Sequence, residues 1–178
     1  MQVNSTGLEL ASYRGGIALI GPALIDITRH FNILRLPKDP LHITLLTSSE
    51  YKAAGKPQLG HLNIQLDRIY VLGLVTRKNV RFLVVVWNHA DYYRKSLGLG
   101  KKAFHLTLSD EDDHEMTKSV SALMVNTSDR DEILDNVVNM GEDAMDHFVV
   151  GCWDDSSLVS PKRILHVPYV HIAYNLHT

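Results

Sequence analysis

Two short stretches of the chain share a strict alternation of apolar and polar residues. Residues 41–45 read Leu-His-Ile-Thr-Leu, and residues 104–108 read Phe-His-Leu-Thr-Leu. A period of two is typical of a β-strand with one buried face, because successive strand side chains point to opposite sides of the sheet. The pattern therefore predicts two strands, each of which buries its apolar residues and presents a His and a Thr together on the other face.

The regions before the two stretches also match each other. A Lys stands four residues before each His, at Lys38 and Lys101. An apolar run and then a helix-like segment precede both stretches in the same order: 17–20 then 22–31, and 82–87 then 89–97. We interpret this as an internal duplication within a single domain spanning 1–178, with halves of roughly 13–60 and 69–125.

Other patterns predict the elements between and after the motifs. Residues 69–75 and 80–87 are strand-like runs around a short polar connection, which indicates a hairpin. Thr47, Ser48 and Ser49 are each natural caps for a short helix that ends near Ala54, and Asn88 can cap the helix before the second motif.

The two ends of the chain have weaker patterns. Residues 1–12 carry no strong pattern and are expected to be a lead-in. Apolar residues at helical spacing predict helices at 129–140 and 142–152, and loose alternation predicts a final strand at 164–174 that closes a sheet. The acidic run 110–114 is expected to be a solvated loop or a first helical turn.

Composition narrows the possible functions. The 178 residues have a net charge of −2, so no strong basic field points to long duplex nucleic acid, whereas a nucleotide or an RNA end needs few charges. One cysteine excludes a disulfide framework and a Cys-rich zinc site. The apolar runs are too short to span a bilayer, and residues 1–12 lack a signal-peptide pattern. We expect an intracellular protein, cytoplasmic or nuclear, that is a monomer or a domain of a larger repair protein.

Two facing His-x-Thr pairs suit phosphodiester chemistry. One neutral imidazole can take a proton from the attacking water or hydroxyl, and one protonated imidazole can give a proton to the leaving oxygen. The Thr hydroxyls are short donors for the nonbridging oxygens, on which negative charge builds. This scheme requires no metal and no cofactor. It predicts a bell-shaped pH profile with both limbs near the ordinary imidazole range.

The motifs His42-Ile43-Thr44-Leu45 and His105-Leu106-Thr107-Leu108 resemble those of the 2H phosphoesterase superfamily. That superfamily includes LigT-like RNA 2′,3′-cyclic phosphodiesterases and a Swiss Army knife branch that resembles RNA-repair enzymes. The resemblance implies an α+β, bilobal 2H phosphoesterase (LigT-like) fold, in which two pseudo-symmetric lobes with largely antiparallel sheets surround a central cleft. It also implies that His42, Thr44, His105 and Thr107 are catalytic. The family suggests His105 as base and His42 as acid, and the reverse order remains open from the residues alone.

Three further residues are candidates for substrate binding. Lys102 precedes the second motif and can meet a phosphate, and Tyr13 and Tyr169 can stack on a base. The alternative for Lys102 is a solvated side chain, and the alternative for the two tyrosines is packing at the core or rim. No metal site is expected, because no HExxH or Cys-His grouping is present. His166 and His171 would be metal ligands only with partners that the pattern does not identify.

The function expected from the resemblance is metal-independent hydrolysis of 2′,3′-cyclic phosphates of nucleotides or RNA 3′ ends to 2′-phosphates, in RNA repair or RNA processing. One alternative is a phosphodiesterase for 2′–5′ linked oligonucleotides. The other is a non-catalytic nucleotide- or RNA-binding module that retains the pocket.

Overall fold

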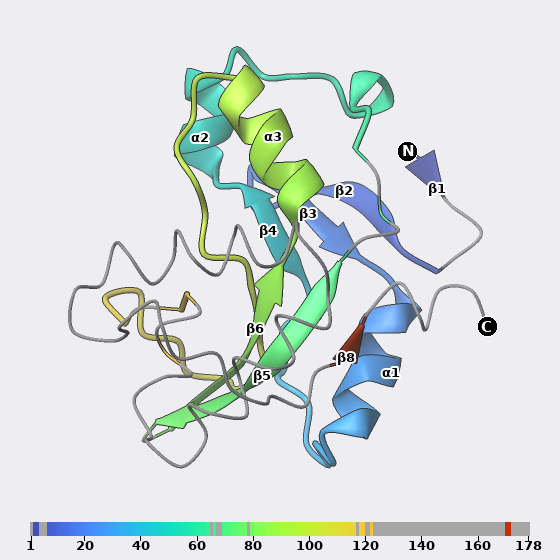
Figure 1. Ribbon diagram of the computed structural model, residues 1–178, viewed down its shortest axis with the longest axis vertical. Helices are drawn as coiled ribbons and strands as arrows, with labels where there is room; N and C mark the ends of the chain where they lie inside the picture. Colours follow the sequence, from blue (N-terminus) through green and yellow to red (C-terminus); the bar gives the residue numbers. More distant parts are fainter. Residues whose placement is uncertain are drawn as a thin grey trace, which may run out of the picture.

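The computed structural model describes residues 2–3, 7–64, 66, 69–77, 79–116, 118–119, 122 and 170–171. Its strands form two antiparallel sheets (Figure 1). The first has the order β1 (Gln2–Val3), β2 (Glu9–Tyr13), β3 (Gly16–Ile20), β4 (Ile43–Leu46). The second has the order β7 (His105–Thr107), β6 (Val80–Val86), β5 (Tyr70–Arg77), β8 (Val170–His171). The helices are α1 (Pro22–His30), α2 (Ser48–Ala53) and α3 (Asn88–Ser96), with a 3-10 turn η1 (Leu59–His61). The fold class is therefore α+β, as the sequence predicts.

The same order of elements occurs in both halves. The hairpin β2–β3 is followed by α1 and then β4, and the hairpin β5–β6 is followed by α3 and then β7. In each case the last strand pairs antiparallel with the second hairpin strand. Within the described part of the chain, β4 and β7 are each the last strand at one edge of a sheet, and they contact each other. The topology thus brings the two His-x-Thr stretches side by side.

The predicted alternation of the motif strands is confirmed. Ile43 and Leu45 are fully buried in the first stretch, and Leu106 and Leu108 are at most 1% exposed in the second. The His and Thr residues between them remain partly exposed. Each motif strand therefore anchors one face in the core and leaves its polar face accessible.

Local capping explains how the short helix α2 forms directly after the first motif. The Thr47 hydroxyl accepts from the backbone N–H of Glu50, and the Glu50 carboxylate accepts from the backbone N–H of Thr47. This reciprocal capping box satisfies donors that a helix start otherwise leaves unpaired. The prediction for α3 was wrong by one residue, because Trp87 is the N-cap and Asn88 is already helical.

Within the lead-in expected at residues 1–12, the described residues 2–3 and 9–12 are instead strands of the first sheet. Leu8 and Leu10 are buried, and Glu9–Tyr13 pairs with Gly16–Ile20 through a two-residue turn at Arg14 and Gly15. Both turn residues have positive φ, as hairpin turns of this length require. The strand was missed because its alternation is interrupted by small and polar residues.

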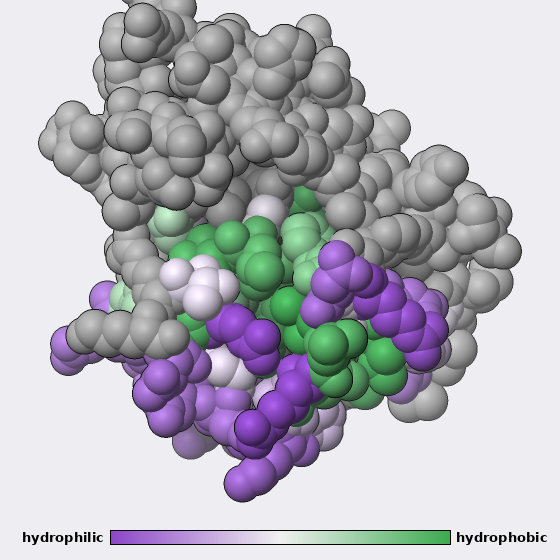
Figure 2. Space-filling model, turned by 90° about the horizontal axis from the view of Figure 1, so that it is seen from below, coloured by the Kyte–Doolittle hydropathy of each residue, from purple (hydrophilic) through white to green (hydrophobic). Residues whose placement is uncertain are grey.

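One core is shared by both sheets, α1 and α3, and α2 packs against it through the partly buried Tyr51. Its largest fully buried side chains include Trp87 and Phe104, whose rings lie 5.6 Å apart. On the face seen in Figure 2, hydrophobic residues gather in the middle of the described surface and hydrophilic residues follow its lower edge.

Some predicted segments lie outside the described residues. These are the helices at 129–140 and 142–152 and all of 164–174 except the short strand β8. Among the described residues, no helix has both the length and the apolar character needed to cross a bilayer.

We predict that Gly16→Ala destabilises the fold, because a Cβ there would overlap the backbone carbonyl of Leu46. The neighbouring strand cannot yield without losing ladder bonds, so the loss should be about 1–3 kcal/mol or more, as for other overpacked sites. Denaturant unfolding measures it. Gly60→Ala is the matched control, since nothing lies within 4 Å of its added Cβ. Equal stability of the two variants would contradict the close approach of β3 and β4.

Candidate active site

One cavity of about 430 Å³ lies where the two motif strands meet. His42 and Thr44 line it from the first motif, and His105 and Thr107 line it from the second. Thr44, His105 and Thr107 belong to β4 and β7, which contact each other, and His42 directly precedes β4. The structure therefore brings together the four residues that the sequence singled out.

The two imidazoles are held in the same way. The Nδ1 atom of His42 lies 2.9 Å from the Pro40 carbonyl oxygen, and the Nδ1 atom of His105 lies 2.8 Å from the Ala103 carbonyl oxygen. A carbonyl oxygen only accepts, so Nδ1 must carry the proton in each case. In the neutral ring, Nε2 is then the basic atom. Each backbone bond thus fixes both the orientation and the tautomer of its ring.

His105 is set in surroundings that disfavour its charged form. Burial lowers the pKa of its imidazole from 6.5 to about 4, and the charge of Lys118 contributes in the same direction. The Ala103 carbonyl and the Asp112 carboxylate oppose this shift without cancelling it. The ring also meets the edge of the Phe82 ring, with centroids 6.2 Å apart. His105 is therefore neutral near pH 7, with a free lone pair on Nε2.

His42 lies against an aromatic ring. The Tyr13 ring centroid is 4.1 Å from that of His42, and the Arg14 guanidinium lies 5.4 Å from the same Tyr13 ring. The Tyr13 hydroxyl is buried and has no hydrogen-bond partner among the described residues. Tyr13 does line the cavity, but in this structure its ring supports His42, so stacking on a base stays a prediction.

The other two predicted substrate contacts have different outcomes. Lys102 lines the cavity, and its Nζ lies 3.0 Å from a carboxylate oxygen of Glu50. Burial lowers the pKa of the Lys102 ammonium, and the Glu50 carboxylate opposes that shift. Tyr169 lies outside the described residues.

The acidic run 110–114 is a loop, which was one of the two structures expected for it. Its composition alone did not reveal that it belongs to the site. Asp110, Asp112 and His114 line the cavity. Asp110 accepts from the backbone N–H of Lys38 at 2.7 Å, which ties this loop to the connection before the first motif. The sequence feature that could have revealed this is the position of the run, which begins shortly after the second motif ends.

The site contains no obvious metal cluster. Among the residues that the structure describes, no three His, Cys, Asp or Glu side chains gather as ligands. His166 and the side chain of His171, the residues named for an alternative metal site, lie outside that part of the chain. The carboxylate of Asp112 pairs with the ammonium of Lys118.

Comparison with known families agrees with the paired motifs. A family model described as "Swiss Army Knife, 2H phosphoesterase domain" matches residues 25–114, which include both motifs, all of α3 and α1 from Ile25 onward. The chain therefore belongs to the 2H phosphoesterase family and carries its phosphoesterase, hydrolytic type of activity. No curated protein and no solved structure matches the chain.

We predict that His105 titrates far below an ordinary histidine. Its imidazole signal should keep the neutral form, with the proton on Nδ1, down to about pH 4. Histidine side-chain NMR during an acid titration measures both the midpoint and the tautomer, and His105→Asn assigns the signal by its absence. A midpoint near 6.5, or a proton on Nε2, would contradict the burial and the Ala103 bond.

We predict that the Tyr13 ring matters and its hydroxyl does not. Tyr13→Phe keeps the contact with His42 and removes a hydroxyl without a described partner, so turnover should stay within about twofold. Tyr13→Ala removes the ring and should lower turnover by roughly tenfold, because a catalytic group that loses its fixed orientation reacts more slowly. Steady-state kinetics of the two variants separates these roles. Equal loss in both would show that the hydroxyl acts instead.

Proposed function

We propose that the chain is a metal-independent 2′,3′-cyclic phosphodiesterase that acts on nucleotides or RNA 3′ ends and leaves a 2′-phosphate. The observation that carries this proposal is the shared geometry of the two imidazoles. Both line one cavity, and both hold Nδ1 on the carbonyl oxygen two residues earlier. Nε2 of each ring is then the atom left for proton transfer to or from a phosphodiester.

The acid and base roles follow from the different surroundings of the rings. His105, with a pKa of about 4, is neutral and is the base that takes a proton from water. Water then attacks phosphorus, and the bond from phosphorus to the 3′ oxygen breaks. His42 gives its Nε2 proton to that oxygen. The Tyr13 ring beside His42 suits this role, because an aromatic face attracts a cation.

Hydrogen-bond donors would carry the charge that develops on phosphorus. The hydroxyls of Thr44 and Thr107 share the cavity with the imidazoles and can donate to the two nonbridging oxygens. Lys102 adds a positive charge at the same cavity. In this proposal the two antiparallel sheets are the lobes, and the cavity between β4 and β7 is the central cleft.

The direct test is turnover in EDTA. We expect hydrolysis of 2′,3′-cyclic AMP and of RNA ending in a cyclic phosphate, with a 2′-phosphate product identified by phosphorus NMR. A 2′–5′ linked adenylate dimer serves as the competing substrate. Turnover of the dimer alone would favour the 2′–5′ phosphodiesterase, and binding without any turnover would favour the non-catalytic module. Loss of activity in EDTA that added metal restores would exclude the metal-independent mechanism.

Substitution should rank the four motif residues. His42→Ala and His105→Ala should each lose about a hundredfold or more in kcat, the usual scale for a general acid or base. Thr44→Ala and Thr107→Ala should lose less, because each removes one donor among several. His61→Ala is the control, since His61 is exposed and does not line the cavity. Full activity in both motif-His variants would place the chemistry elsewhere.

The pH profile should be asymmetric. The base must be neutral, and His105 is neutral above a pKa of about 4, so the acid limb of kcat/KM should lie near pH 4. The expectation from sequence, with both limbs near the ordinary imidazole range, is corrected here because burial lowers one pKa. A bound phosphate anion favours the protonated ring, so the acid limb of kcat should lie higher than that of kcat/KM. An acid limb of kcat/KM near 6.5 would contradict the assignment of His105 as base.

A further inference from the structure

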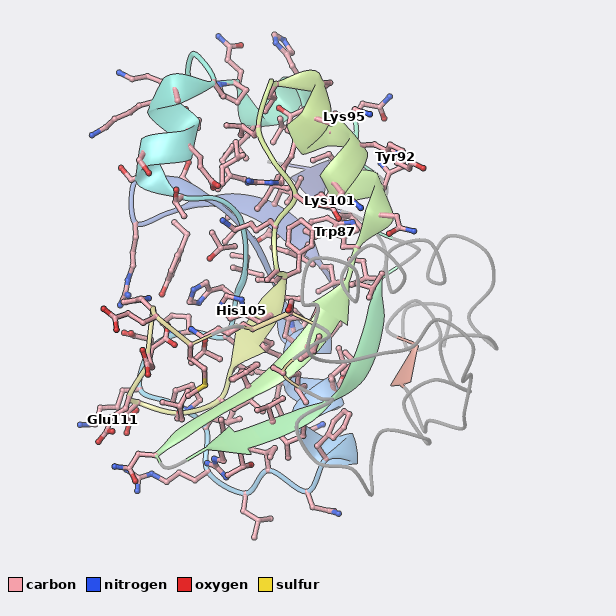
Figure 3. All side chains as sticks on the ribbon, turned by 60° about the vertical axis from the view of Figure 1, so that its left-hand side comes forward. Trp87, Tyr92, Lys95, Lys101, His105 and Glu111 are labelled. Carbon is pink, nitrogen blue, oxygen red and sulfur yellow. The ribbon has the colours of Figure 1, made fainter. Side chains whose placement is uncertain are left out.

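A buried arginine outside the motifs joins the two halves beside the cavity. Arg94 of α3 is only 3% exposed. Tyr92 and Lys95 of the same helix point outward instead (Figure 3). The Nη1 atom of Arg94 donates to the Leu45 carbonyl oxygen at 2.8 Å, and its Nε donates to the Gly100 carbonyl oxygen at 3.1 Å. Leu45 directly follows the first His-x-Thr motif, and Gly100 lies in the segment that leads into the second motif. One guanidinium thus ties both motifs together.

The same arginine holds a carboxylate from the first half. Arg94 binds both oxygens of Glu50, at 2.7 Å from Nη2 and 3.0 Å from Nη1. Burial alone would raise the pKa of the Glu50 carboxyl, but the hydrogen bonds from Arg94, Thr47 and Lys102 outweigh it and lower the pKa to about 2. Glu50 therefore remains charged under all conditions in which the protein would work.

Glu50 in turn holds Lys102. The Lys102 ammonium lies 3.0 Å from the Glu50 oxygen that also accepts from the Thr47 backbone N–H. The Lys102 side chain is mostly buried, at 16% exposed, yet it lines the cavity, whereas Arg94 and Glu50 do not. A flexible lysine is thereby fixed in one place at the wall of the cavity.

The charges of this cluster do not cancel. Of these three side chains, Arg94 and Lys102 carry two positive charges against the single negative charge of Glu50, so one positive charge remains among them. A further carboxylate, that of Asp91, accepts from the backbone N–H of Lys102 at 3.3 Å. The remaining positive charge is presented to the cavity through Lys102, the member that lines it. Asp39, Asp110 and Asp112 also line the cavity, and each is paired with a cation of its own: Arg14, Arg35 and Lys118. The surplus charge at Lys102 is therefore suited to an incoming phosphate.

We propose that Glu50 and Arg94 are positioning residues that hold Lys102 in place to bind the phosphate of the substrate. The proposal rests on the proposed function for the identity of the substrate, but its binding step can be tested without turnover. Without Glu50, the Lys102 ammonium would face the buried Arg94 guanidinium with no carboxylate between them. Repulsion and the lost bond would then move Lys102 away from the cavity.

A double-mutant cycle tests the proposal, with 2′-AMP and inorganic phosphate as probes in calorimetry. Lys102→Met should raise Kd roughly tenfold or more, the usual effect of losing one hydrogen bond to a charged group. Glu50→Gln should raise Kd by a similar factor. The double variant should bind no more weakly than Lys102→Met alone, because Glu50 acts only through Lys102. Lys102→Arg should recover much of the affinity.

Controls separate positioning from folding and from the reaction itself. Lys101→Met should bind as the unchanged protein does, since Lys101 is exposed and does not line the cavity. Thermal melting checks that each variant folds. If Glu50→Gln does not fold, Arg94→Lys takes its place in the cycle. Three results would overturn the proposal. The first is a double variant whose increase in Kd equals the product of the two single increases. The others are unchanged binding by Lys102→Met and failure of the unchanged protein to bind either probe. Probe binding with no turnover of any substrate would instead overturn the proposed function and leave the positioning role intact.

Discussion

The relative position of the two halves of the chain depends on the buried guanidinium of Arg94. A buried charge is costly unless its donors are satisfied, and here four bonds reach the Leu45 and Gly100 carbonyls and both Glu50 oxygens. Such a cluster adds little net stability compared with apolar packing, but it tolerates few alternative geometries. It therefore restricts the relative positions of the first motif strand and of the segment that leads into the second motif. The positions of the two imidazoles at the cavity are restricted with them.

Duplication alone would give two equivalent histidines, whereas acid–base chemistry needs two different ones. The structure keeps the backbone bond of each ring the same and changes what surrounds it. His105 is partly buried against Phe82 and near Lys118, which lowers its pKa to about 4. The bond from His42 to Pro40 is exposed, and its ring rests on Tyr13. In the proposed mechanism, the division of labour between base and acid arises in this way, without a change in either motif.

Sequence reasoning succeeded where the determinants were local. The period of two in each motif placed Ile43 and Leu106 in the core, and the hairpin and helix signals located β5, β6 and α1 to within a residue or two. It failed where the determinants were distant. Two partners of Arg94, Glu50 and Leu45, lie 44 and 49 residues away, so no short window of sequence relates them to it. The pKa of His105 depends on burial by the whole fold, and a short sequence motif cannot predict that burial.

The charge pattern of the cavity limits the kind of phosphate ligand that suits it. Its three aspartates are each held by a cation, and Lys102 supplies the charge that remains. A long polyanion gains affinity by neutralising many phosphates at once, and this chain, with a net charge of −2, offers no such field. One charge, two Thr hydroxyls and two imidazoles can instead surround a single phosphate from several sides. Under the proposed function, this balance suits one terminal phosphodiester, and the orientation of the donors rather than long-range attraction would provide the selectivity.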